Sequence, residues 1–232
     1  MVLILQNVAC EGPGTIATYL PSHDLAFTTA RLFEGTGVAP KLDRASHLVV
    51  LGGSMSVYQE LEFPFLKEEC HLLEAAIRED IPTLGICLGA QLIAKVLGSK
   101  IVKAPRKEVG WYNVRLTSEG RKDPLFKGLG EELRVFQWHE DTFELPAKAA
   151  LLAESRTCRN QAFRYGHNVY GLQFHLEVDG SMIEHWFDEY SPEDPLRKAA
   201  LSEVREREAL FQAQAERLYG NFFSPPFKEQ SE

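Results

Sequence analysis

Short apolar runs alternate with longer amphipathic segments along the first part of the chain. Three runs have the length and composition of buried strands: 1–6, 47–51 and 82–86. The stretches after the last two runs, 64–80 and 88–97, place apolar residues at helical spacing. Pro64 suits a first helical turn, and Gly98 ends the second stretch. This pattern predicts a strand–helix–strand–helix unit over 47–97 and favours a parallel sheet covered by helices.

Shorter apolar stretches, separated by turns, replace this pattern in the second half. Five of them are predicted strands that complete the sheet and add a small antiparallel patch: 112–116, 133–138, 150–153, 161–165 and 169–174. Residues 191–194 (SPED) have the composition of a helix start. Beyond them, one apolar face of a long helix is marked by Leu201, Val204, Phe211, Leu218 and Phe222. Such a stripe is typical of core packing.

These elements together predict an α/β fold with a mostly parallel central sheet flanked by helices. We assign residues 1–190 to the main domain and 191–232 to a C-terminal helical extension that packs on the same domain. Residues 15–20 fit a short helix, and residues 25–33 favour neither a helix nor a strand. The tail at 224–232 is expected to be loose.

The composition is ordinary for a globular protein and argues against two kinds of partner. Of the 232 residues, 44% are hydrophobic and 25% are charged, and the formal net charge is -8. The chain has no basic run, so we expect no nucleic-acid partner. The apolar start of the chain is too short to span a bilayer and lacks the features of a signal peptide. We therefore expect a cytoplasmic protein without membrane contact.

Four cysteines stand at positions 10, 70, 87 and 158, and no two of them have CxxC spacing. None lies in a metal-like cluster with histidine, so the sequence predicts neither a metal site nor a cofactor. Without a secretory signal, the thiols are expected to be reduced. Cys10, Cys70 and Cys158 fit the role of small buried hydrophobes, whereas Cys87 belongs to a motif.

Cys87 lies where a buried strand is predicted to turn directly into a helix. Gly85 and Gly89 flank it in the pattern G-x-C-x-G, the cysteine counterpart of the nucleophile elbow. Such a turn needs small residues on both sides, and it places the nucleophile at the carboxyl edge of the sheet, where open parallel sheets bind ligands. The helix N-terminus there stabilises a thiolate. A buried structural cysteine with incidental glycines is the alternative interpretation.

The same turn offers a donor for an oxyanion. The backbone N–H of Leu88 would point at the oxyanion that forms when Cys87 attacks a carbonyl group. A second donor must come from another loop, and the neighbouring strand ends in Gly52 and Gly53. Because glycine lets the backbone come close, we nominate the N–H of Gly53 as that second donor.

A thiolate nucleophile needs a base, and His175 is the candidate. His175 and Glu177 follow an apolar stretch and stand two positions apart, so in an extended chain they point the same way. The carboxylate can hold the orientation and tautomer of the imidazole, and the imidazole can activate Cys87. An isolated H-x-E pair is typical of a polar surface, but together with the elbow it indicates a catalytic triad of Cys87, His175 and Glu177.

Three segments stand in the order and spacing of class I glutamine amidotransferase domains: LGGS at 51–54, GICLGAQLIAKVLG at 85–98 and GLQFHLE at 171–177. The resemblance covers roughly residues 45–180 and implies a flavodoxin-like arrangement of the predicted α/β fold. It also implies the same triad, with Gly53 and Leu88 as the oxyanion donors. Gln91 matches a family position that helps to hold the substrate glutamine.

Further segments are similar to the stand-alone branch described as GMP synthase-like: EVGW at 108–111, WHEDTFELP at 138–146 and NQAFRYG at 160–166. His139 and Asp141 correspond to a motif near the active-site rim of GMP synthase amidotransferase domains, where a hydrogen-bonding role is expected. The residues after Glu177 look helical and contain no P-loop, so the sequence departs there from GMP synthase.

The resemblance implies a glutamine amidotransferase or glutaminase that hydrolyses the γ-amide of glutamine through a cysteinyl thioester, with an unknown acceptor. A γ-glutamyl peptide hydrolase with the same triad is the alternative, because related family members cut such peptides. A non-catalytic regulatory module that kept the fold is a third hypothesis, which selective alkylation of Cys87 would contradict. The expected partners are a small-molecule substrate and, for an amidotransferase, a separate synthetase subunit that supplies the acceptor.

Overall fold

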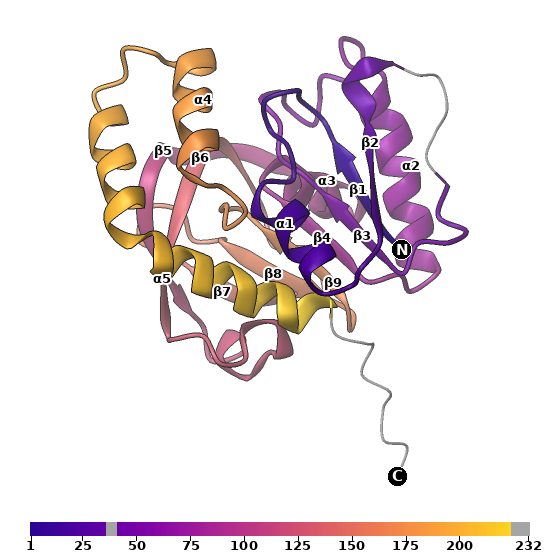
Figure 1. Cartoon of the computed structure of the whole chain (residues 1–232). Coiled ribbons are helices and arrows are strands. Elements are labelled where there is room, and N and C mark those ends of the chain that lie inside the picture. Colours follow the sequence, from indigo (N-terminus) through magenta and orange to yellow (C-terminus); the bar gives the residue numbers. More distant parts are fainter. Residues whose placement is uncertain (36–40, 224–232) are drawn as a thin grey trace.

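The structure is a computed structural model that describes residues 1–35 and 41–223, so the tail expected to be loose lies outside it. A nine-stranded sheet runs through the described part, and helices cover both of its faces (Figure 1). Its strands are β1 (Val2–Gln6), β2 (Phe27–Arg31), β3 (His47–Val50), β4 (Thr83–Ile86), β5 (Ile101–Leu116), β6 (Glu132–Phe143), β7 (Ala150–Glu154), β8 (Ala162–Tyr165) and β9 (Val169–Leu172). The α-helices are α1 (Thr15–Ser22), α2 (Phe65–Arg78), α3 (Leu88–Val96), α4 (Gly180–Tyr190) and α5 (Arg197–Phe223). The predicted class, an α/β fold with a central sheet flanked by helices, is confirmed.

The strand order β2-β1-β3-β4-β9-β8-β7-β5-β6 divides the sheet into a parallel and an antiparallel part. The first five strands in this order pair in parallel, and the ambiguous stretch at 25–33 supplies β2. The other four strands pair antiparallel and form more than the small patch expected, because β5 and β6 pair along most of their length. The first part of β5 contains Pro105 and several charged residues, so it carried no strand signal.

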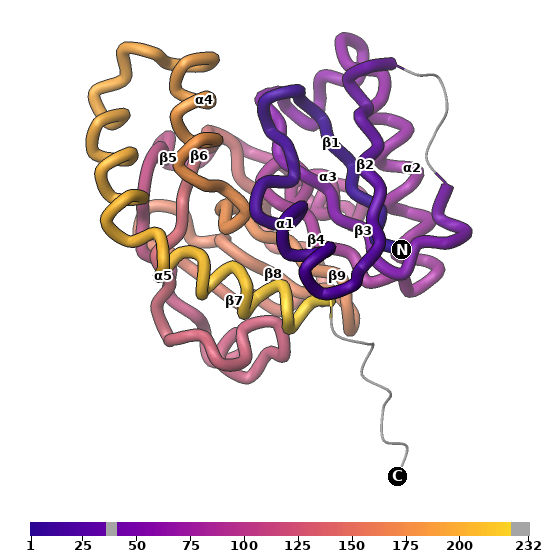
Figure 2. The backbone as a smooth tube through the Cα atoms, in the orientation of Figure 1, coloured from indigo at the N-terminus to yellow at the C-terminus, as the bar shows by residue number. Residues whose placement is uncertain are grey.

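Different helices cover the two faces of the parallel part (Figure 2). Ile4 of β1 belongs to the apolar cluster under α1 and the C-terminal half of α5. Its neighbour Leu5 belongs to the cluster under α2 and α3 on the opposite face. Because both faces are buried, these strands are continuous apolar runs rather than alternating ones, which made them visible in the sequence.

One helix of the C-terminal region was missed by the sequence analysis. The helix α4 begins after Asp179, whose side chain accepts a hydrogen bond from the N–H of Met182 at 2.8 Å. Residues 191–194, predicted as a helix start, lie instead in the turn between α4 and α5, and α5 begins at Arg197. The local cap residues at 191–194 therefore marked the neighbourhood of a helix start and missed its position.

The long helix α5 packs on the sheet and on α4, and it is kinked at Arg207 (φ -125°, ψ 18°). Val204 and Phe211 join the aromatic cluster beside α4, whereas Leu218 and Phe222 pack under the parallel strands. The predicted apolar stripe is thus a packing surface. The division into domains at 190/191 stays a prediction.

Candidate active site

The turn between β4 and α3 holds Cys87 in a backbone conformation that few non-glycine residues adopt (φ 52°, ψ -106°). The Cys87 N–H donates to the carbonyl of Leu172 in β9 at 2.7 Å, which fixes the turn to the sheet. A Cβ on Gly85 would lie 2.5 Å from the carbonyl of Gly89, and a Cβ on Gly89 would lie 2.2 Å from the Val50 oxygen. Both flanking positions therefore require glycine, as the elbow pattern predicted.

His175 and Glu177 follow β9, and two backbone hydrogen bonds of 2.8 and 3.2 Å join His175 to Phe136 of β6. The Nδ1 atom of His175 lies 2.6 Å from Oε1 of Glu177, and both side chains are at most 3% exposed. Glu177 Oε2 also accepts the N–H of Leu176 at 3.0 Å. Burial opposes a charge on the imidazole, but the Glu177 carboxylate, together with hydrogen bonds to Cys87 and Glu177, raises the pKa of His175 well above its ordinary value.

Cys87 and His175 line the same pocket, and Cys87 is among the groups that raise the pKa of His175. Gly52 lies against both: a Cβ there would be 3.2 Å from Cε1 of His175 and 3.7 Å from Cβ of Cys87. The pocket has a volume of about 310 Å³, at the low end for small-molecule sites. The structure thus brings together the three residues predicted as a triad, Cys87, His175 and Glu177.

The two predicted oxyanion donors also lie side by side. Gly53 lines the pocket, and Leu88 is the first residue of α3. A Cβ on Gly53 would lie 2.6 Å from the sulfur of Met55 and 2.7 Å from the side chain of Leu88, so a larger residue here would require these two side chains to shift. The role of the two N–H groups as oxyanion donors stays a prediction.

A buried polar pair supports the Gly52–Gly53 loop from behind. Asn7 Nδ2 donates to the carbonyl of Leu51 at 3.2 Å. Within the described residues, neither the Asn7 Oδ1 atom nor either carboxylate oxygen of Glu69 in α2 has a hydrogen-bond partner. Burial raises the pKa of Glu69 to about 8, and the nearby Asn7 amide offsets this only in part. A protonated Glu69 can donate to the unpaired oxygen of Asn7 and so help to hold the loop.

Replacing Glu69 by glutamine is expected to make the stability of the protein less sensitive to alkaline pH. Because the pKa of Glu69 is about 8 in the folded chain and about 4.5 unfolded, its stabilisation is full below the lower value. It is lost progressively as the pH rises through the higher one. Urea unfolding at about pH 5 and about pH 9 measures the effect. The wild type should lose a few kcal/mol more than Glu69→Gln between these pH values, whereas equal losses would show that Glu69 is already ionised in the native state.

Gln91, predicted to hold the substrate, is buried and lines the pocket. Its Nε2 atom donates to the carbonyl of Asp141 at 3.0 Å and to Oε1 of Gln173 at 3.3 Å. Both amide hydrogens therefore have protein partners, and the Oε1 atom is the group that remains for a ligand. A substrate-binding role of Gln91 stays a prediction.

Two polar residues of the pocket, Glu11 and Tyr190, were overlooked by the sequence analysis. The Tyr190 hydroxyl donates to Oε1 of Glu11 at 2.9 Å and lies 3.1 Å from the sulfur of Cys10. Glu11 follows β1 at the carboxyl edge of the parallel strands, and a carboxylate in that place was a usable signal. Tyr190 offered no such signal, because it is the last residue of the helix that was missed.

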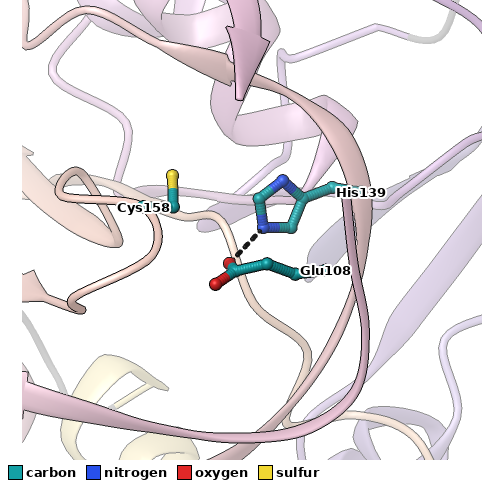
Figure 3. A group of neighbouring side chains, drawn as sticks. All are labelled: Glu108, His139 and Cys158. Carbon is teal, nitrogen blue, oxygen red and sulfur yellow. Dashed lines mark hydrogen bonds and ion pairs between the residues drawn. The ribbon is translucent and has the colours of Figure 1, made fainter. Parts of the chain in front are cut away.

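A buried group of Glu108, His139 and Cys158 has donor atoms close enough to hold a metal ion (Figure 3). Nε2 of His139 lies 2.9 Å from Oε2 of Glu108, and the Cys158 thiol donates to Oγ1 of Thr142 at 3.2 Å. Glu108 accepts two further side-chain hydrogen bonds, from Thr157 and Gln161. Burial alone would raise the pKa of Glu108, but these hydrogen bonds, led by the one from His139, leave it lowered. We interpret the group as a hydrogen-bonded cluster, because its polar atoms already have protein partners.

The Glu108–His139 pair holds the strand segment that faces Cys87. Nδ1 of His139 lies 2.9 Å from the carbonyl of Asp141. On the residue before His139, the carbonyl of Trp138 accepts a weak hydrogen bond from the Cys87 thiol at 3.7 Å. The structure thus gives His139 a hydrogen-bonding contact at the rim of the pocket, the kind of role that the sequence analysis favoured.

Replacing Glu108 by glutamine is expected to lower the free energy of unfolding by about 2 kcal/mol and kcat/KM by about tenfold. The substitution removes the charged partner of His139 and so loosens the segment beside Cys87. Glu140→Gln is the matched control, because Glu140 is a carboxylate on the neighbouring strand β6, 55% exposed and paired with lysines. Urea unfolding and steady-state kinetics measure both effects. Equal effects of Glu108→Gln and Glu140→Gln would contradict a positioning role of Glu108. A fall in the Tm of the wild type after dialysis against EDTA would indicate a bound metal ion.

Fold and site together define an α/β protein with a cysteine elbow at the carboxyl edge of a parallel sheet and a buried histidine–carboxylate pair beside it. The family model described as Glutamine amidotransferase class-I matches residues 26–187. The chain therefore belongs to the class I glutamine amidotransferase family.

Individual similar proteins indicate which branch of the family the chain resembles. The chain is 34% identical over 177 residues to the glutamine amidotransferase-like protein YfeJ of Salmonella typhimurium, covering 75% of this chain and 74% of YfeJ. It is 40% identical over 109 residues to one subunit of the glutamine-hydrolyzing GMP synthase of Pyrococcus abyssi, covering 46% of this chain and 56% of that relative. The crystal structure of a glutamine amidotransferase from Thermotoga maritima superposes with a TM-score of 0.88 at 33% identity, covering 97% and 98% of the two chains. The predicted GMP synthase-like resemblance is confirmed.

The described residues also bear on the cysteines and on membrane contact. All four cysteines are free thiols, with Cys70 and Cys158 buried as predicted and Cys10 half-buried. In the ranges that the structure describes, no helix is long and apolar enough to cross a membrane.

Proposed function

We propose that the chain cleaves the γ-amide of glutamine through a thioester on Cys87, as a glutaminase or as the glutaminase part of an amidotransferase. The observation that carries the proposal is that Cys87 and His175 line one pocket, with Nδ1 of His175 2.6 Å from Oε1 of the buried Glu177. Membership of the class I glutamine amidotransferase family indicates the substrate.

The first half of the reaction forms the acyl-enzyme. His175 takes the thiol proton, and the sulfur of Cys87 attacks the γ-carbonyl carbon, forming the C–S bond. The oxyanion is stabilised by the N–H groups of Gly53 and Leu88. His175 then gives its proton to the amide nitrogen, the C–N bond breaks and ammonia leaves. Glu177 keeps the imidazole in the orientation and tautomer that these transfers need.

The second half regenerates the enzyme. A water molecule enters where ammonia left, and His175 takes one of its protons as the oxygen attacks the thioester carbon. The C–S bond breaks, glutamate leaves, and His175 returns a proton to the sulfur of Cys87. All of these bond changes balance with the enzyme's own side chains and one water molecule.

A substrate screen tests the proposal. Purified protein is incubated with glutamine and with γ-glutamyl peptides, and released glutamate is read by mass spectrometry, with Cys87→Ser as the blank. Glutamine turnover by the wild type alone supports the proposal. Turnover of γ-glutamyl peptides without glutamine turnover would replace it by the peptide-hydrolase alternative. Glutamate release that is equal in wild type and blank would contradict cysteine catalysis, and release by neither protein would support the regulatory module.

A separate synthetase partner is the second part of the proposal. The Pyrococcus relative is, by its name, one subunit of a GMP synthase, and this chain is similar to part of it. A partner that moves the Gly52–Gly53 loop would bring the Gly53 N–H toward the oxyanion, and one such donor contributes roughly 3 kcal/mol, or about a hundredfold in rate. We expect kcat for glutamine to rise by up to this factor when cell extract is added. High kcat without extract, and no gain with it, would defeat the partner hypothesis.

A further inference from the structure

Glu11 is an ionisable group of the pocket that the proposed reaction does not use. It follows β1, is 7% exposed and lines the same pocket as Cys87 and His175. Its Oε1 atom accepts the hydroxyl of Tyr190 at 2.9 Å. Within the described part of the chain, no donor forms a hydrogen bond with its Oε2 atom. This atom is unpaired without being fully buried. This oxygen is therefore open to the pocket and free to accept from a ligand.

The open oxygen of Glu11 lies beside the catalytic groups. A Cβ on Gly52 would be 2.6 Å from Oε2 of Glu11 and 3.2 Å from Cε1 of His175, so one small residue separates the carboxylate from the imidazole. Trp186 fixes this arrangement: its ring packs edge-on against His175 at 4.9 Å, and its Nε1 donates to the carbonyl of Cys10 at 2.9 Å. The backbone that carries Glu11 is thus held against His175.

The position identifies the part of the substrate that Glu11 can meet. His175 must give its proton to the departing nitrogen, so that nitrogen leaves from a point next to the imidazole. An acceptor that adjoins the imidazole and lacks a protein donor is placed for the N–H groups of this nitrogen. The charged groups of the opposite wall, Lys103 and Lys107, are already paired with Asp141 and Glu140.

We propose that Glu11 receives the amine that leaves the substrate and binds it as an ammonium ion. The inference rests on the proposed function, and the ligand class is ammonium or a small primary alkylammonium. Tyr190 orients the carboxylate by donating to its other oxygen.

Each proton in this step has a source and a destination. His175 supplies one proton to the amide nitrogen, which leaves as neutral ammonia. Ammonia is a strong enough base to take a further proton from solvent at neutral pH, and the ammonium ion forms a charge-assisted hydrogen bond with the open oxygen of the Glu11 carboxylate. Burial raises the pKa of Glu11 and the neighbouring His175 opposes this in part, and pairing with the ammonium ion favours the carboxylate further. The ammonium ion leaves by diffusion, and no covalent bond of Glu11 changes.

Such trapping opposes the delivery of neutral ammonia to a synthetase, so it favours the glutaminase form of the proposed function. It also gives product inhibition by ammonium that depends on one side chain.

Ammonium inhibition of Glu11→Gln tests the inference. The substitution removes the charge, and the new side-chain amide oxygen can still accept from Tyr190, so the fold should persist. Turnover of the best substrate is measured against ammonium chloride, with sodium chloride at equal ionic strength as the reference. We expect the inhibition constant for ammonium to rise by at least about tenfold in Glu11→Gln, the effect of one charge-assisted hydrogen bond. Glu140→Gln, which removes another carboxylate of the same pocket, should leave the constant unchanged.

Three outcomes would overturn the inference. Unchanged ammonium inhibition in Glu11→Gln, with Cys87-dependent turnover intact, would refute the role of Glu11 and leave the proposed function standing. Absence of Cys87-dependent turnover in the wild type would refute both. A rise in KM for glutamine, but not for glutaramate, which lacks the α-amino group, would show that Glu11 binds the substrate's own ammonium instead. If Glu11→Gln does not fold, Tyr190→Phe should weaken ammonium inhibition by severalfold, and no change there would count against the inference.

Discussion

Replacing Cys87 by serine is expected to lower kcat by about four orders of magnitude or more while the fold is retained. Serine has nearly the same shape as cysteine, and the hydrogen bonds of the sulfur to Trp138 and Gln173 are long, at 3.7 and 3.8 Å. An alcohol is a far weaker nucleophile than a thiol at neutral pH, so the chemical step is lost rather than the site. Released glutamate measures kcat, and circular dichroism with a thermal melt checks the fold.

Alkylation gives an independent measurement on the same residue. Burial raises the pKa of Cys70 to about 11 and also raises the pKa of Cys158 and of Cys10, so these thiols should react slowly with iodoacetamide. Cys87, beside the imidazole of His175, should be modified first, with activity lost in proportion. Wild-type rates in Cys87→Ser would exclude covalent catalysis through this residue, and an inert Cys87 would support the non-catalytic module.

Replacing His175 by alanine is expected to lower kcat about as much as Cys87→Ser, whereas Glu177→Gln should cost about two to three orders of magnitude. His175 carries every proton transfer of the proposed reaction, while Glu177 acts through it. In the wild type, Glu177 accepts the N–H of Leu176 at 3.0 Å and places a charge 2.6 Å from Nδ1 of His175. A glutamine side chain can keep the first contact but carries no charge. Steady-state kinetics on the two variants measure the difference.

The pH profile separates the roles of His175 and Glu177. The Glu177 carboxylate is the strongest influence that raises the pKa of His175 against the effect of burial. The imidazolium therefore persists to higher pH in the wild type, and it is lost as the pH rises through this raised value. In Glu177→Gln the limb of the kcat–pH profile that reports the titration of His175 should move to lower pH. An unmoved limb, or a Glu177→Gln variant as inactive as His175→Ala, would contradict the assignment of Glu177 as the orienting residue.

The sequence predicted the parallel part of the fold well because its signals are local. Strands buried on both faces must be apolar throughout, so β1, β3 and β4 appear as short continuous runs. Part of the elbow is equally local, since a side chain on Gly85 would meet Gly89 within the same turn. This steric demand lies between neighbouring residues and can be read without a structure, whereas Gly89 is required by its contact with Val50 of β3.

The antiparallel part and the helix α4 were harder to predict because their stability comes from distant partners. The charged first part of β5 becomes a strand by pairing with β6, and α4 is held by the aromatic cluster around Trp138 and Trp186. Propensity is a weak guide when such long-range packing decides the conformation.

The candidate site divides in the same way. The sequence alone predicted Cys87, His175 and Glu177 as the triad, because a nucleophile in a tight turn and a base with its carboxylate each leave a short pattern. Only the tertiary structure revealed that Glu11 and Tyr190 share the pocket and that Glu69 stands behind the Gly52–Gly53 loop. Their chemistry comes from burial and from partners on other elements, and a single carboxylate or phenol in a sequence carries no mark of either. The fold decides such contacts when it brings separate strand ends and helix ends to one edge of the sheet.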